Sequence, residues 1–336
     1  MDRKFSSSPP KNLLQKFNSG KTPKEKKQIR LVLLFLFGLT ILPVILAILY
    51  RELPSFLRKF NQPSSPVFSE QFTPISPTAT PTPKLKKEKE AVLEITKQLR
   101  GKYGVVFQDL QTKDSFAINS KEVFTAASLM KLPVIITLYR EAEAGRINLD
   151  EVHKLQASDK VSGAGSLQYK PVGYEITWRG MAELMGKQSD NTAFSIVSRK
   201  LGKEKIQELI NALGMKSTSF AENETSPEDI GLLFRKLYGE GVVYEKDKEE
   251  ILSFLTDTIW EDRIPAGIPK GIKVSHKIGT EVGVISDAGI VLAQQPFILV
   301  IMSEEANEIE AKKALPEITK KIYELIIEKL DKLGEP

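Results

Sequence analysis

The segment FTAASLMKLPV, Phe124–Val134, places a lysine three residues after a serine at the start of an apolar helical pattern. Residues i and i+3 share one helical face, so Lys131 can lie beside the Ser128 hydroxyl. Serine is a weak nucleophile and needs a base, and burial or a second cation can make a lysine neutral enough to act as one. By itself this motif is weak and leaves a surface role for Lys131 open, because the same spacing occurs at Ser8–Lys11 in the basic tail, where a catalytic role is implausible.

Two further segments decide between these interpretations. QSDNTA contains Ser189–Asn191 between two helical patterns, and VSHKIGTEVG contains Lys277–Thr280 on a strand pattern. Ser-x-x-Lys, Ser-Asp-Asn and Lys-x-Gly in this order resemble the motif set of class A β-lactamases and related penicillin-binding proteins. The runs GAGSL (163–167) and ITWRGMAELM (176–185) are also similar to that family. The resemblance covers about residues 86–336.

Helical and strand patterns alternate along residues 86–336. The helical patterns fall at 88–100, 128–143, 176–188, 191–201, 203–214, 226–241 and 307–333, and the strand patterns at 103–110, 271–279, 287–294 and 296–303. Strands at both ends with helices between them predict one sheet and a helical insertion. With the resemblance, we expect an α/β (α+β) fold whose antiparallel sheet is flanked by helices and whose all-helical subdomain spans about 124–268.

The resemblance implies a role for each matched catalytic residue. Ser128 attacks the substrate carbonyl and becomes acylated, with Lys131 as the base. Ser189 relays a proton to the leaving nitrogen. No metal or organic cofactor is implied.

The resemblance also implies how the substrate binds. Asn191 contacts the side-chain amide, and Lys277 attracts the carboxylate. The backbone N–H of Thr280 completes the oxyanion hole with that of Ser128. Gly279 allows the substrate to approach the strand edge.

The carboxylate-binding part departs from the family pattern. Ile278 stands where the family has a threonine or serine, and Thr280 is the nearest residue that could supply a hydroxyl. The next strand pattern, VISDAGIVLA, has Asp287 in the neighbourhood where a family arginine often assists.

The segment that should release the acyl group departs further. Class A enzymes use a glutamate in a long loop, followed at short spacing by Leu-Asn. Here GMKSTSFAENETSPEDIG (214–231) is short, with Glu222 and Glu224 as candidates. Three functions follow: a β-lactamase, a D-Ala-D-Ala carboxypeptidase or penicillin-binding protein with slow deacylation, and a non-catalytic cell-wall-binding module. The intact motifs argue against the last.

The N-terminal quarter predicts a membrane anchor. Residues 31–50 form a twenty-residue run without a charge, long enough to span a bilayer. A cleaved signal peptide is the alternative, but no clear cleavage site follows. Residues 1–30 carry nine Lys/Arg and two acidic residues, which predicts a cytoplasmic tail. Residues 51–85, with seven prolines from Leu53 to Lys84, are typical of a linker, here to an extracytoplasmic catalytic domain at 86–336.

Composition limits the remaining possibilities. The chain has a net charge of +5, but its first 30 residues carry +7, so the other 306 sum to −2 and no nucleic-acid partner is expected. It has no cysteine and two distant histidines, which excludes disulfides and a histidine-rich metal site. The expected partners are a β-lactam or a peptidoglycan stem peptide, and the membrane through residues 31–50. We expect a monomer.

Overall fold

The computed structural model describes residues 85–239 and 241–334. The predicted tail, anchor and nearly all of the linker therefore lie outside the described residues. Within the described part, no helix combines the length and the apolar character that crossing a membrane requires.

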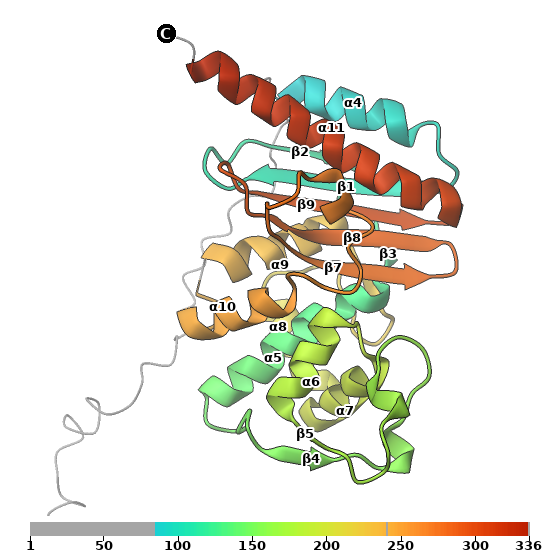
Figure 1. The fold of residues 1–336 in the computed structure, drawn as a ribbon, viewed down its shortest axis with the longest axis vertical. Coiled ribbons are helices and arrows are strands. Elements are labelled where there is room, and N and C mark those ends of the chain that lie inside the picture. Colours follow the sequence, from blue (N-terminus) through green and yellow to red (C-terminus); the bar gives the residue numbers. More distant parts are fainter. Residues whose placement is uncertain (1–84, 240, 335–336) are drawn as a thin grey trace, which may run out of the picture. The chain divides into compact units, whose positions relative to one another are not determined.

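One antiparallel sheet of five strands is built from both ends of this part of the chain, as predicted (Figure 1). The order is β2-β1-β9-β8-β7. The strands are β1 (Lys102–Asp109), β2 (Ser115–Ile118), β7 (Val274–Glu281), β8 (Val284–Val291) and β9 (Phe297–Glu304). Strand β1 pairs with β9 along its whole length, so the N-terminal hairpin is held by the last strand.

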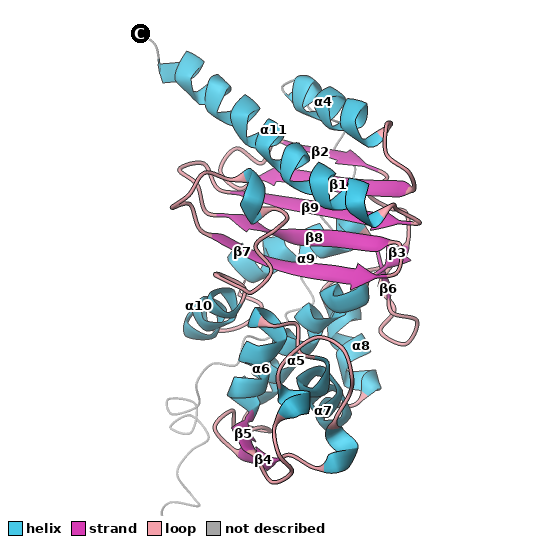
Figure 2. Ribbon diagram, turned by 45° about the vertical axis from the view of Figure 1, so that its right-hand side comes forward, coloured by secondary structure: helices cyan, strands magenta, loops and turns pink. Residues whose placement is uncertain are grey.

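Both faces of the sheet are covered by helices (Figure 2). Along β9, Phe297, Leu299 and Ile301 pack toward α4 (Lys86–Thr96) and α11 (Glu308–Gly334). The alternate residues of the strand, from Ile298 to Met302, pack into a second core with the inserted helices. Side chains alternate across a strand, so burial on both sides explains the unbroken apolar sequence FILVIM.

The insertion between β2 and β7 is mostly helical. Its helices are α5 (Lys131–Glu143), α6 (Trp178–Lys187), α7 (Asn191–Leu201), α8 (Lys203–Ala212), α9 (Pro227–Gly239) and α10 (Glu245–Phe254), with short turns η2 (Ala127–Met130), η3 (Ala157–Asp159), η4 (Leu167–Tyr169) and η5 (Pro265–Gly267).

The prediction of an all-helical insertion is wrong in one respect. Two small antiparallel sheets lie within it, made by β3 (Phe124–Thr125) with β6 (Glu224–Thr225) and by β4 (Val152–Lys154) with β5 (Glu175–Thr177). Segments of two or three residues are too short to show a strand alternation in sequence.

Helix α9 packs against the main sheet. A Cβ at Gly231 of this helix would stand 3.2 Å from the Val106 side chain of β1, so the glycine allows the helix to approach the strand closely.

Side-chain caps fix where the helices nearest the site begin. The Thr177 hydroxyl accepts the backbone N–H of Gly180 at the start of α6, and Asp190 accepts that of Ala193 at the start of α7. Such caps satisfy donors that have no partner inside the helix. Helix α11 runs continuously through Pro316.

Candidate active site

The serine lies where the insertion meets the edge strand of the sheet. Ser128 is in η2, directly before α5, and is partly exposed. The preceding Ala127 has a φ of 47°, a conformation that costs energy in a residue with a Cβ and is common at functional sites. A Cβ at Gly279 of β7 would stand 2.9 Å from the Ala126 carbonyl oxygen, so this glycine lets β7 pack against the serine segment.

Lys131 contacts two other predicted site residues. Its Nζ donates to Ser128 Oγ at 2.7 Å and to Asn191 Oδ1 at 2.9 Å. The residue is only 3% exposed. Burial lowers the pKa of Lys131 to about 8, although the charges of Asp190 and Glu281 oppose the change. A substantial neutral fraction near neutral pH is what a lysine base requires.

The Ser-Asp-Asn segment presents its three side chains in different directions. Asp190 caps α7 through Oδ1 and accepts the backbone N–H of Leu167 through Oδ2, both at 2.8 Å. Asn191 turns its Oδ1 to Lys131 and donates from Nδ2 to the Ser162 carbonyl. Ser189 has a φ of 56°, and its hydroxyl is buried without a hydrogen-bond partner. A strained residue with an orphaned buried hydroxyl is unusual and calls for a functional explanation.

Two glycines of the run GAGSL allow this loop to lie against the Ser-Asp-Asn segment. Gly163 and Gly165 have φ values of 117° and 97°. A Cβ would come within 2.4 Å of Asn191 Nδ2 at the first position and 2.1 Å of Asp190 Oδ2 at the second. The glycines are therefore required by both conformation and space.

Lys277 lies at the base of the site. It is 1% exposed, and its Nζ donates to the Ile278 carbonyl at 3.3 Å. Burial, and then the charge of Lys131, lower the pKa of Lys277 well below its ordinary value. A bound carboxylate would supply the counter-charge that favours the ammonium form.

Arg263 was not predicted from the sequence, although it contacts the Lys277–Thr280 segment. It comes from the loop after α10 and is buried. Its guanidinium donates to the Gly279 and Ser286 carbonyls at 3.0 and 2.5 Å and to Thr280 Oγ1 at 2.6 Å. No signal in the sequence links it to Lys277–Thr280, since the link exists only through the folded loop.

A short hairpin borders the other side of the serine segment. Ser219 and Glu224 pair across it, and the Asn223 carbonyl accepts the backbone N–H of Ala126 at 2.8 Å. The predicted candidates Glu222 and Glu224 are both exposed. Asn223 Nδ2 instead contacts Oε1 of Glu281, at the end of β7, at 3.3 Å.

The structure therefore unites residues from three distant segments. Hydrogen bonds join Ser128, Lys131 and Asn191, packing brings Gly279 to them, and the field of Lys131 reaches Lys277. Among residues 85–239 and 241–334, no cluster of three histidine or acidic side chains could hold a metal ion.

The Ser128 hydroxyl is hydrogen-bonded to a buried lysine, Lys131, and a second buried lysine, Lys277, lies within reach of its charge. On an α+β fold, this arrangement defines a serine hydrolase of the acyl-enzyme type. Comparison of the chain with known proteins supports the same class. The family model described as "Beta-lactamase enzyme family" matches residues 84–326.

Several relatives cover most of the chain. Beta-lactamase 3 of Bacillus cereus is 24% identical, over 66% of this chain and 75% of its own length. Beta-lactamase CARB-3 of Pseudomonas aeruginosa is 22% identical, over 72% and 91%. The structure of PBP-A is similar with a TM-score of 0.68 and 23% identity, over 73% of this chain and 97% of that one. A β-lactamase from Sphaerobacter thermophilus gives 0.68 and 24%, over 72% and 97%.

The chain belongs to the β-lactamase enzyme family. It is a serine hydrolase of that family, and its fold is the one that these solved structures share.

Proposed function

We propose that the protein opens the β-lactam amide through an acyl-enzyme on Ser128. The observation that carries the proposal is the contact of 2.7 Å between Lys131 Nζ and Ser128 Oγ, made by a buried lysine with a lowered pKa. Such a lysine can accept the hydroxyl proton as the oxygen attacks.

The acylation step then runs as follows. Ser128 Oγ bonds to the carbonyl carbon while Lys131 takes its proton. The backbone N–H groups of Ser128 and Thr280 stabilise the oxyanion. As the C–N bond breaks, the leaving nitrogen receives a proton through Ser189, whose hydroxyl has no competing hydrogen bond.

Recognition of the substrate carboxylate falls to Lys277, Arg263 and Thr280 in this proposal. Arg263 donates to the Thr280 hydroxyl, so the two residues form one polar corner, and the charge of Arg263 acts on buried Lys277. This corner compensates for Ile278, which has no hydroxyl. Asn191 is assigned to the substrate's side-chain amide through the remaining capacity of its own amide.

Release of the acyl group needs a carboxylate that can take a proton from water. Two acidic residues act electrostatically on Lys131, namely Asp190 and Glu281. Both oxygens of Asp190 are engaged in backbone contacts. Glu281 is exposed and held at the hairpin by Asn223, so we assign water activation to Glu281 rather than to Glu222 or Glu224.

A specific observation also favours a second candidate, a D-Ala-D-Ala carboxypeptidase or penicillin-binding protein with slow deacylation. The hairpin that replaces the long loop leaves both of its glutamates, Glu222 and Glu224, exposed. The structures similar to this one include a mutant of PBP-A described as an acyl-enzyme complex with penicillin G. In that case the penicillin adduct on Ser128 would persist.

One experiment tests both candidates. The full chain is mixed with benzylpenicillin, and its intact mass is followed over time. A transient adduct with steady release of penicilloate supports the β-lactamase, and a stable adduct supports the penicillin-binding protein. A chain that never gains mass with β-lactams or a D-Ala-D-Ala peptide is left with the non-catalytic role.

We also propose a place for this chemistry in the cell. Residues 31–50 would anchor the chain in the cell membrane in a single pass, with residues 1–30 in the cytoplasm and the domain at 86–336 outside, acting as a monomer. The charge-free run and its basic flank support the proposal. Protease added to intact cells should remove the catalytic domain and leave an anchored N-terminal fragment.

A further inference from the structure

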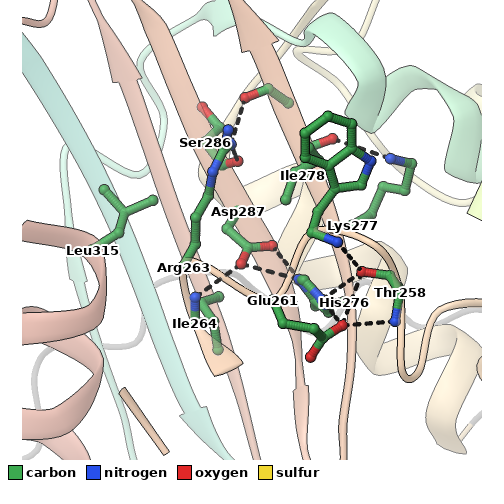
Figure 3. A network of polar contacts seen from close by, with 12 residues as sticks. Thr258, Glu261, Arg263, Ile264, His276, Lys277, Ile278, Ser286, Asp287 and Leu315 are labelled. Carbon is green, nitrogen blue, oxygen red and sulfur yellow. Dashed lines mark hydrogen bonds and ion pairs between the residues drawn. The ribbon is translucent and has the colours of Figure 1, made fainter. Parts of the chain in front are cut away.

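A buried histidine lies directly beside Lys277 on the edge strand. His276 of β7 is 1% exposed. Its Nδ1 is 2.9 Å from Oδ1 and 3.1 Å from Oδ2 of Asp287, and its Nε2 is 3.2 Å from Oε1 of Glu261 (Figure 3). Thr258 Oγ1 is a further contact of Nε2 at 3.3 Å.

This geometry sets the charge of the ring. An ionised carboxylate only accepts hydrogen bonds, so a ring with a carboxylate at each nitrogen needs an N–H on both. A neutral imidazole has one N–H and would leave one contact unmade. The two carboxylates outweigh burial and raise the pKa of His276 to about 9.

The two carboxylates join separate segments of the chain. Asp287 of β8 also accepts the backbone N–H of Ile264 at 3.0 Å. Glu261 also accepts the backbone N–H and the hydroxyl of Thr258, at 2.7 and 2.9 Å. His276 therefore links β7 and β8 to both ends of the loop 258–264.

That loop carries Arg263. His276 and Lys277 are successive residues of a strand, so their side chains lie on opposite faces of the sheet. Both ring nitrogens of His276 are already in contact with Asp287, Glu261 and Thr258, which leaves the ring no polar atom for a substrate, while its loop delivers Arg263 to the Gly279 carbonyl and the Thr280 hydroxyl.

We propose that His276, held as a cation between Asp287 and Glu261, is a positioning residue that fixes Arg263 against Thr280 and so maintains the carboxylate-binding corner. The inference rests on the proposed function, because it concerns the rate at which carboxylate-bearing β-lactams acylate Ser128. His276 itself does not touch the substrate.

Other charges surround this cluster. Asp287 and Glu261 act on His276 from β8 and the loop, and Asp287 also acts on Lys277 and on Arg263. Asp262 and Glu308 act on Arg263 from the loop and α11. Their titrations contribute to any pH profile, so the test compares variants at each pH.

The experiment uses the full chain, the substitution His276→Gln, and two probes, benzylpenicillin and its methyl ester. The ester keeps the β-lactam and loses the carboxylate charge. We expect His276→Gln to lower the second-order acylation rate with benzylpenicillin by about tenfold, as for one lost charge-assisted hydrogen bond. The rate with the ester should change by less than about twofold. His153→Gln, in β4 of the insertion, is the matched control and should affect neither probe.

The pH dependence separates a positioning role from a general loss of structure. The ratio of wild-type to His276→Gln rates should be constant at neutral pH and fall toward one above about pH 9, where the wild-type ring loses its proton. Equal slowing of acid and ester, or a ratio that does not change with pH, would overturn the proposal.

The experiment needs one control for folding and another for the proposed function. If His276→Gln fails to fold by circular dichroism, Glu261→Gln is used, because Glu261 is partly exposed, and a smaller loss confined to benzylpenicillin is expected. If the wild-type chain is never acylated, the proposed function fails. If it is acylated and neither variant discriminates acid from ester, only the present inference fails.

Discussion

The side-chain nitrogen of Lys131 lies 2.7 Å from the hydroxyl oxygen of Ser128, within a buried site that lowers the pKa of Lys131 to about 8. The nucleophile and its base are therefore in contact before a substrate arrives. The first expected outcome follows from this contact. Ser128→Ala should abolish the mass gain with benzylpenicillin, whereas Ser8→Ala, at the other Ser-x-x-Lys of the chain, should retain it. An adduct that survives Ser128→Ala would show that another residue is acylated.

The base itself is tested by Lys131→Arg, which keeps the charge but cannot lose its proton. We expect acylation to fall by about 10²- to 10⁴-fold, the usual contribution of a general base. In the wild-type chain the acylation rate should rise with pH through about 8 as Lys131 becomes neutral. Stopped-flow measurement from pH 6 to 10 checks the profile, and a rate that decreases over this range would contradict the assignment.

Arg263 is expected to act in substrate binding. Arg263→Ala should raise the dissociation constant for benzylpenicillin by about 10- to 100-fold, as for the loss of one or two charge-assisted hydrogen bonds. Arg263→Lys should restore little, because an ammonium cannot bond two carbonyls and the Thr280 hydroxyl in the same geometry. Saturation kinetics separate binding from the chemical step. A change confined to the chemical step would argue for a role in the oxyanion hole instead.

Three glutamates offer a matched comparison for the release step. Glu281→Gln should leave acylation nearly unchanged and slow deacylation by about 10²- to 10⁴-fold, so that the adduct accumulates. Glu222→Gln and Glu224→Gln should hydrolyse the adduct at the wild-type rate. Time-resolved mass spectrometry distinguishes the three. Accumulation in either control, with normal turnover in Glu281→Gln, would reverse the assignment.

The raised pKa of His276 predicts how the free energy of unfolding depends on pH. Its folded pKa of about 9 lies above the ordinary value of 6.5, so protonation stabilises the folded chain fully below pH 6.5, and this is lost as pH rises through about 9. A shift of this size corresponds to on the order of 3 kcal/mol. Urea unfolding at pH 6, 7.5 and 9.5 should show the wild type losing stability relative to His276→Gln. Parallel curves for the two proteins would mean that the ring does not change charge.

Much of the fold could be predicted from sequence. The segments that form β1, β7, β8 and β9 are long and apolar enough to be predicted as strands. Their positions near both ends of residues 86–336 predicted a single main sheet, which the structure confirms. Strand β2 and helix α10 were missed. The first has four residues, and the charged sequence EKDKEEILSF of α10 shows a weak apolar face.

The candidate site was predictable where residues act at fixed local spacing. Ser128 and Lys131 lie three residues apart, and the Ser-Asp-Asn and Lys-x-Gly segments were read as motifs. Arg263, His276 and Glu281 could not be found in this way. Their partners lie 11 to 58 residues away in sequence, and the contacts exist only once the loop 258–264 and the hairpin have folded.

The pairing of β1 with β9 has a consequence for how the protein is made. The nucleophile is synthesised early, but it faces β7, and the N-terminal hairpin must wait for β9, almost 200 residues later, to become part of a sheet. Such non-local pairing is slow and exposes unpaired strand edges until the chain is complete. A polypeptide that stops before Glu304 should therefore have no partial activity, and premature termination would yield an aggregation-prone fragment rather than a weak enzyme.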